Sequence, residues 1–314
     1  MRVIAQRVGQ LIIVLLAVTA LTALLFSQLP GDLAEVSIPF GSDAQREALR
    51  EDLGLNESVP VQYVKWLGNF VQGDFGSFYR QGNVTPVLDR ITATAPKSIQ
   101  LLIYAQFIAL ALSIPLGIVT ARRAGTMIDK SANTVAFALL STPNFVLGLV
   151  LAYLVGVELE WLPPQGYVHF SENPVDHFRS MLLPALSLGI GLVATYMRLL
   201  RTDLVATLQQ DFVLMAKSKG ISERRVLWRH ALRPSSITLI TAAGLNIGAL
   251  IGGALVIEII FNIDGMGRLL FEAINERQIV AVQSLVALVA TGYVVVNFLV
   301  DIVYAIVDPR IRRG

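Results

Sequence analysis

The sequence has 314 residues, of which 54% are hydrophobic and 15% are charged, and its mean hydropathy is +0.62. This composition excludes an ordinary soluble domain and indicates an integral membrane protein. The net charge of +2 is too small to indicate a nucleic-acid-binding protein. Because the chain contains no cysteine, it has no disulfide, thiolate metal site or cysteine nucleophile.

Six segments are long and apolar enough for a membrane-crossing helix, which needs about 20 residues. They are 9–29, 98–120, 131–157, 181–197, 235–260 and 279–307. No small-residue cleavage pattern follows the first segment, so we expect an uncleaved helix there. The fourth segment is the shortest and contains Pro184, Gly189 and Gly191. The sequence predicts an all-α integral membrane protein with six transmembrane helices.

The lysine and arginine residues predict the orientation. Sixteen of them lie on one side of the six spans, in the segments 1–8, 121–130, 198–234 and 308–314. Three lie in the short loops of the other side, 158–180 and 261–278. Because cytoplasmic loops carry an excess of Lys and Arg, we expect both termini in the cytoplasm.

Residues 30–95 connect the first two spans on the predicted outer side. Residues 43–49 and 60–67 have helix-like amphipathic patterns, and a glycine-rich turn follows at 73–78. We expect this segment to fold as a small extracytoplasmic cap.

The longest inner loop contains a basic helix–turn–helix pattern at residues 211–234, which we call the elbow. Asp211 is suited to cap the first helix, along which Phe212, Met215 and Ala216 follow an apolar spacing, and Gly220 is suited to end it in a left-handed conformation.

A second elbow helix is expected from the Ser222 cap to Pro234, which closes the unit. One of its faces carries Val226, Leu227, His230 and Ala231, and the other carries Arg224, Arg225, Trp228 and Arg229. Such a basic amphipathic loop is suited to hold anionic lipid, or to dock in a groove of a cytoplasmic partner. Its length and charge leave both possibilities open.

The elbow has a fixed spacing: Ala216, three residues, Gly220, nine residues, and then His230 to Pro234. This spacing resembles the characteristic cytoplasmic loop of binding-protein-dependent ABC importer permeases, which reads Glu-Ala-Ala, three residues, Gly, nine residues, hydrophobic-x-Leu-Pro. Leu214 and Met215 replace the Glu-Ala, and Arg233 is an extra residue before the proline. These departures resemble the oligopeptide/dipeptide/nickel branch of the family.

Other segments resemble the same branch in the expected order. They are Arg7, 29–32, 73–77, Thr142-Pro143, 258–268 and 308–312. The resemblance implies the type I ABC importer permease fold. It divides the chain into 1–29 (N-terminal cytoplasmic tip and first helix), 30–95 (extracytoplasmic segment), 96–307 (transmembrane domain of five helices) and 308–314 (cytoplasmic tail).

The resemblance also implies a function. The chain is expected to be a multi-pass subunit of the bacterial cytoplasmic (inner) membrane that forms half of a translocation pathway for di- or oligopeptides. Nickel or another small solute is the alternative cargo. The implied partners are a second homologous permease subunit, two cytoplasmic ATPase subunits or domains, an extracytoplasmic substrate-binding protein and the lipid bilayer, but no nucleic acid.

The chain contains no Gly-x-x-x-x-Gly-Lys-Ser/Thr loop for ATP phosphates. We therefore expect it to bind no cofactor and not to be an enzyme, with ATP and Mg used by the partner ATPases. The family resemblance places the ATPase contact at Ala216, Lys219, Gly220, Ile221 and Ser222.

Small and polar residues within the spans are candidates for the translocation pathway or for helix packing. They are Asn144, Asn246, Gly244, Gly248, Gly252, Glu258 and Gln283. The three glycines form two Gly-x-x-x-Gly repeats, which permit a close helix contact within the subunit or across the pore. Glu258 is suited to meet a peptide amino terminus or a metal cation, and a bond to a neighbouring loop is the alternative.

An outer loop contains His169, Glu172, Asp176 and His177, whose spacing fits no strong metal-ligand pattern, so we expect no metal site. An intramembrane enzyme is not indicated, since no metalloprotease or serine hydrolase motif is found. A stand-alone channel or secondary transporter is the alternative of another class, although the two halves of the chain show no convincing repeat.

Overall fold

The computed structural model describes residues 2–28, 33–38, 41–80 and 83–307. The predicted tail 308–314 and the motif at 29–32 lie outside the described residues. The chain forms two compact units, and neither is one continuous stretch. The first contains residues 1–98 and 264–295, and the second contains 99–263 and 296–314.

The first unit combines short helices, a hairpin and the starts of two long helices. Its elements are α1 (Arg2–Ser27), α2 (Leu33–Ser37), α3 (Asp43–Asp52), α4 (Val59–Val71), β1 (Ser77–Arg80), β2 (Asn83–Pro86), the start of α5 (Val87–Arg122), α12 (Met266–Asn275) and the start of α13 (Ile279–Val307). β1 and β2 pair antiparallel. The amphipathic stretches 43–49 and 60–67 are helical, as predicted. Ser42 begins α3 with a capping box formed with Gln45.

Residues far apart in the sequence hold the first unit together. Its core joins Phe78 and Val87 to Leu269 of α12 and Leu285 of α13. The indole N–H of the buried Trp66 donates to Ser284 Oγ at 2.9 Å. The segment after the first helix therefore packs against the first turns of α13, which is why residues 264–295 belong to this unit.

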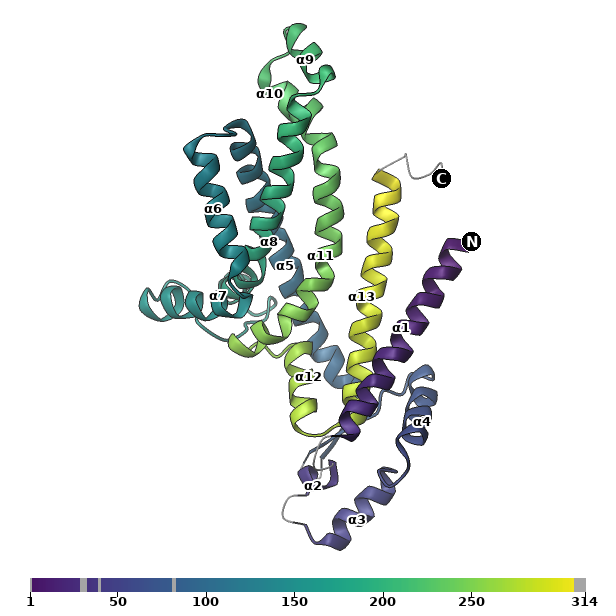
Figure 1. Cartoon of the computed structure of the whole chain (residues 1–314). Coiled ribbons are helices and arrows are strands. Elements are labelled where there is room, and N and C mark those ends of the chain that lie inside the picture. The colour runs from purple at the N-terminus through teal and green to yellow at the C-terminus, as the bar shows by residue number, and fades with distance from the viewer. Residues whose placement is uncertain (1, 29–32, 39–40, 81–82, 308–314) are drawn as a thin grey trace. The chain divides into compact units, whose positions relative to one another are not determined.

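All the regular elements among the described residues of the second unit are helices. Its elements are the rest of α5, α6 (Met127–Ser141), α7 (Asn144–Leu151), the π-helix η1 (Ala152–Glu158), α8 (Pro174–Leu208), α9 (Asp211–Ser218), α10 (Glu223–Arg225), the π-helix η2 (Val226–Ala231), α11 (Leu232–Ile260) and the end of α13. Helix α8 lies at its centre and packs against α6, α7 and α11 (Figure 1). Gly189 of α8 permits a close approach to α5, since a Cβ there would lie 2.8 Å from the Ala105 carbonyl oxygen.

Within the described residues, α5, α8 and α13 are long and apolar enough to cross a membrane. Two bent helix pairs raise this number to five if each pair is one span. The apolar stretch of α1 that qualifies, Ile12–Ser27, is shorter than a span. The structure therefore establishes a mainly helical chain with three to five candidate spans. The six spans and the cytoplasmic location of both termini stay predictions.

Two predicted spans differ from the observed helices. Segment 131–157 is not one helix, because it bends by 102° between α6 and the helical stretch Asn144–Glu158. The break follows from Pro143, which lacks an N–H and holds Thr142 in an extended conformation. In contrast, Pro184 does not shorten the helix predicted at 181–197, which extends over Pro174–Leu208 as α8.

Candidate coupling site

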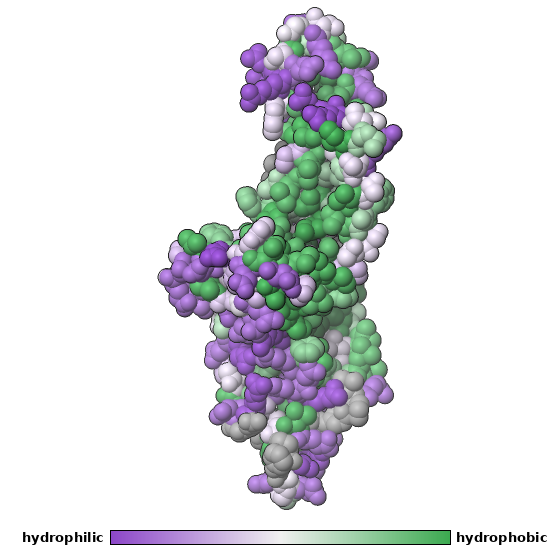
Figure 2. Space-filling view, turned by 90° about the vertical axis from the view of Figure 1, so that its left-hand side faces the viewer, coloured by the Kyte–Doolittle hydropathy of each residue, from purple (hydrophilic) through white to green (hydrophobic). Residues whose placement is uncertain are grey.

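The elbow connects α8 to α11 and lies at one end of the second unit (Figure 1). Hydrophilic residues gather at this end, whereas hydrophobic residues cover much of the helices next to it (Figure 2). Residues 211–234 thus carry a polar surface, as the charge pattern predicts for a loop outside the membrane.

The first elbow helix, α9, ends in a turn that requires glycine. Gly220 has a φ of +74°, and its N–H donates to the Lys217 carbonyl oxygen at 2.9 Å. The Ile221 N–H donates to the Ala216 carbonyl oxygen at 3.3 Å. These two bonds form a Schellman motif, which confirms the predicted left-handed stop. At the other end Gln210 is the N-cap, so the prediction of Asp211 as the cap was wrong by one residue.

A small core fixes the angle between the two arms of the elbow, which are α9 and the helical stretch formed by α10 and η2. Val213, Ala216 and Val226 are buried together, and Leu208 and Ile221 pack against them. Phe212 and Met215, predicted on the same side as Ala216, are instead 48% and 58% exposed. The reason is that α9 packs only against a small part of the elbow. Only the stripe of side chains that contains Val213 and Ala216 is therefore buried.

The second arm largely follows its predicted pattern. Val226, Leu227 and Ala231 are buried, whereas Arg224, Arg225, Trp228 and Arg229 are exposed. Ser222 is the N-cap, although its side chain makes no capping hydrogen bond. Pro234 does not close the unit as predicted, because it lies in the first turn of α11, where a missing N–H is tolerated.

The residues predicted at the ATPase contact differ in exposure. Lys219, Gly220 and Ser222 are exposed, Ile221 is half-buried, and Ala216 is buried. A Cβ on Gly220 would meet no atom within 4 Å, so the turn presents its backbone to open space. The exposed surface of α9 also includes Phe212, Leu214 and Met215. Sequence reasoning assigned no contact role to these three, because apolar residues at helical spacing usually face a core.

A buried ion pair, which sequence reasoning missed, joins α8 to α6 near the elbow. The Arg201 guanidinium of α8 donates to both carboxylate oxygens of Asp129 in α6, at 2.5 and 2.6 Å. The Gly125 N–H and the Asn133 amide also donate to Asp129, whose side chain is 4% exposed. Asp129 is the only acidic residue in the basic segment 121–130, but the sequence gives no signal for its partner.

Further contacts join the elements on either side of the elbow. Ser235 of α11 donates from its hydroxyl to Thr207 Oγ1 of α8 at 2.9 Å. Arg122 at the end of α5 forms an exposed ion pair with Glu223 of α10 at 3.7 Å. Helices α8 and α11, which the elbow connects, are therefore hydrogen-bonded directly to each other next to the elbow.

The structure brings some of the predicted pathway residues together. Asn144 begins α7 at the 102° bend, and its side-chain atoms lie next to Gly191 of α8 and Gly253 of α11. Gly244 packs against Val300, whose Cγ1 lies 2.3 Å from the position of a Cβ on that glycine. This glycine of the repeat therefore serves a contact within the subunit.

The remaining predicted pathway residues do not form one cluster. Gly252 has no neighbour within 4 Å of a Cβ, and Gly248 is half-buried. The Asn246 amide donates to the Ala242 carbonyl oxygen of its own helix. Glu258 is fully buried, and Gln283 is buried in the first unit.

Two of the four residues considered as metal ligands bind other groups of the chain. His177 is buried, and its Nδ1–H donates to the Val168 carbonyl oxygen at 2.7 Å while Nε2 accepts from the Tyr104 hydroxyl at 3.0 Å. Asp176 accepts from the Asn173 amide. No group of three or more His, Cys, Asp and Glu side chains suited to a metal occurs among the described residues.

Family comparisons cover nearly the whole chain. Residues 113–313 match the family described as "Binding-protein-dependent transport system inner membrane component". Residues 1–102 match "Binding-prot-dependent transport system membrane comp, N-term". The first match includes the whole elbow.

Individual relatives are similar over almost their full length. The chain is 38% identical to the oligopeptide transport system permease protein AppB of Bacillus subtilis, over 98% of each chain. It is 36% identical to a putative peptide transport system permease protein of Brucella abortus and 32% identical to a probable peptide ABC transporter permease protein of Sinorhizobium fredii, again over 98% of each chain. Among solved structures, a chain of the inward-facing MetNI methionine ABC transporter aligns with a TM-score of 0.55 and 13% identity, covering 70% of this chain and 97% of that one. This last likeness shows a shared fold.

Proposed function

This chain belongs to the family of inner membrane components of binding-protein-dependent transport systems, and we propose from that membership that its elbow couples a separate ATPase to the membrane helices. The chain is a permease subunit of a peptide ABC importer in the inner membrane. Permeases of such importers work with ATPase and binding-protein partners. The specific complex proposed here contains one further homologous permease, two ATPase subunits or domains and one extracytoplasmic binding protein.

The observation that carries the coupling role is the form of the elbow. Its turn is fixed by the Schellman bonds at Gly220, and its arms are fixed by the core of Val213, Ala216 and Val226. Outside this core it exposes Phe212, Leu214 and Met215 together with lysines and arginines. A rigid, exposed element with apolar and cationic side chains is suited to a protein groove, since a lipid-binding loop needs no such fixed turn.

The contact surface therefore comprises Lys219, Gly220, Ile221 and Ser222 at the turn, and the exposed face of α9 beside it. Ala216 supports this surface from beneath, because its side chain is buried. ATP and Mg²⁺ bind to the partner subunits, and this chain supplies no nucleotide site. The energy of hydrolysis enters this chain only as mechanical displacement of the elbow.

The mechanism we infer is alternating access. When the ATPases close, the elbow moves, and α8 and α11 move with it because both are continuous with the elbow and joined by the Ser235–Thr207 bond. The Asp129–Arg201 pair extends the same movement to α6. Closure opens the pathway outward to receive peptide from the binding protein, and hydrolysis resets it.

Transport by the reconstituted complex tests this function. Proteoliposomes containing the complete complex and the binding protein are expected to accumulate a radiolabelled tripeptide only when ATP is supplied. The chain reconstituted alone is expected to accumulate none, and a complex whose ATPases carry a substituted P-loop lysine serves as the control. Undiminished uptake by the chain alone would contradict the proposal and favour a stand-alone transporter. Uptake of nickel in place of peptide would leave the coupling intact but change the cargo.

A further inference from the structure

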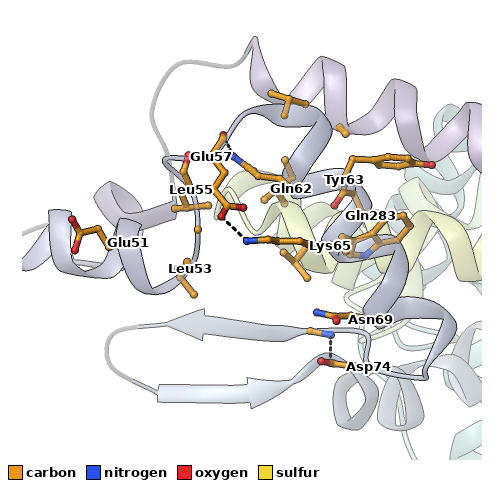
Figure 3. Close-up of a pocket in the computed structure, with 17 residues that line it drawn as sticks. Glu51, Leu53, Leu55, Glu57, Gln62, Tyr63, Lys65, Asn69, Asp74 and Gln283 are labelled. Carbon is orange, nitrogen blue, oxygen red and sulfur yellow. Dashed lines mark hydrogen bonds and ion pairs between the residues drawn. The ribbon is translucent and has the colours of Figure 1, made fainter.

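A cavity of about 330 Å³ lies within the first unit. Its walls come from α1, the turn before α4, α4 itself, the glycine-rich turn at 73–76 and the start of α13. This volume is at the small end of the range for ligand pockets in proteins. Figure 3 shows its polar lining, with Glu57 and Lys65 facing each other and Glu51 set apart from the other carboxylates.

The side chain of Gln283 faces this cavity. Gln283 is 3% exposed and lines the cavity from the first turns of α13. No other described residue forms a hydrogen bond with its side-chain amide. Because the side chain is largely enclosed by protein and opens to the cavity, its amide is available to a ligand or an ordered water there.

A second acceptor supports the same conclusion. Glu57 Oε1 accepts from the Lys65 ammonium at 2.5 Å, which satisfies one carboxylate oxygen. The other oxygen, Oε2, is buried and has no hydrogen-bond partner. Asp74 accepts from the Gly76 N–H through its Oδ1 atom. One oxygen of Glu57 and one of Asp74 therefore remain able to accept a hydrogen bond from a ligand.

The charge of the lining selects for a cation. The lining includes three carboxylates, of Glu51, Glu57 and Asp74, and one ammonium, of Lys65, which is already paired with Glu57. A metal ion is not favoured, because the described residues contain no group of His, Cys, Asp and Glu suited to hold one. A primary ammonium fits better, since it offers three donors to carboxylate and amide oxygens.

The amides of Gln283 and Asn69 add both donors and acceptors beside the carboxylates. This combination is complementary to an ammonium group followed by a peptide group. We propose that the cavity binds the amino-terminal end of a short peptide. The inference rests on the proposed function in that it takes peptides to be the cargo.

Peptide binding to the purified permease in nanodiscs of phosphatidylethanolamine and phosphatidylglycerol tests the inference. Trialanine is expected to bind at least about tenfold more tightly than N-acetyl-trialanine, which has the same backbone without the charge. Glu57→Gln and Gln283→Leu are each expected to weaken trialanine binding by about tenfold. Glu172→Gln, an exposed change outside the cavity, is the matched control and is expected to have no effect.

Folding is checked by the melting temperature of each variant. Asn69 is exposed, so Asn69→Ala provides a variant that leaves the packing intact if the others unfold, and about a threefold weakening is expected. Equal binding of both peptides, or trialanine binding unchanged by these substitutions, would overturn the inference.

Three further outcomes separate this inference from others. If no peptide binds, but Glu57→Gln weakens docking of the binding protein, the cavity is a socket for that protein and the inference is wrong. If the complex imports peptide under ATP while the cavity binds none, only the inference fails. If the complex imports no peptide at all, the proposed function itself fails, whatever the cavity binds.

Discussion

Gly220 combines a positive φ with a position on the exposed turn of the elbow. A side chain there costs about 1–2 kcal/mol in backbone strain but meets no neighbouring atom. Its main effect is therefore on whatever approaches the turn from outside. Gly166 is a natural comparison, because it also has a positive φ and open space around it, but lies outside the elbow and away from the Asp129–Arg201 pair.

We predict that Gly220→Trp leaves the protein folded in the membrane and reduces ATP-driven uptake by at least about tenfold, since the indole blocks a docked partner. Gly166→Trp introduces comparable strain and is expected to retain most of the uptake. Co-purification of the ATPases measures the contact directly. Normal uptake with Gly220→Trp would remove the turn from the coupling site.

The Asp129–Arg201 pair gives a second prediction at this scale. Asp129→Asn leaves a largely buried guanidinium without its anion, so we expect the free energy of unfolding to fall by roughly 2–4 kcal/mol. Glu223→Gln breaks the exposed pair with Arg122 and is expected to cost less than about 1 kcal/mol. Denaturant unfolding in detergent micelles measures both. Equal losses for the two variants would show that the buried pair is not a stabilising clamp.

The buried face of α9 differs from the apolar face that its sequence predicts. Val213 joins Ala216 in the small core, whereas Phe212 and Met215 are exposed. Exposed apolar side chains on a rigid helix commonly mark a protein interface. The element therefore separates into residues that hold the elbow together and residues that are available to a partner.

This separation predicts opposite phenotypes for neighbouring residues. Met215→Glu is expected to leave the melting temperature unchanged but to weaken ATPase binding by about tenfold, because it places a charge in an apolar contact. Val213→Ala removes buried methyl groups and is expected to lower the stability by roughly 1–2 kcal/mol. Thermal unfolding and co-purification distinguish the two effects. A Met215→Glu variant that still binds the ATPases with normal affinity would exclude this face of α9 from the interface.

The whole chain lends itself to a direct test of topology, since it contains no cysteine. Single cysteines at the exposed positions Ser218, in the elbow, and Asn56, before α4, report on opposite sides of the predicted membrane. We expect a membrane-impermeant maleimide to label Asn56→Cys in intact spheroplasts, and Ser218→Cys only after the membrane is opened. Labelling of both positions from the same side would contradict the predicted orientation and the coupling role together.

The sequence alone does not predict which segments of the chain share a compact unit. The predicted boundary between 95 and 96 follows the apolar segments, yet the first compact unit includes residues 264–295. The bond from Trp66 to Ser284 joins residues 218 positions apart, and nothing in the local pattern of either residue indicates the other. The boundary itself stays a prediction.

The sequence by itself determined the membrane class, the family and the elbow turn. Composition, periodicity and the need for glycine at a positive φ are local properties, so residues such as Gly220 carry their signal in the chain. Only the tertiary structure decided which side chains are buried. It placed Asp129 against Arg201, turned Met215 outward and left the amide of Gln283 facing a cavity. Each of these depends on elements that are distant in sequence, and packing between such elements determines which polar groups find partners.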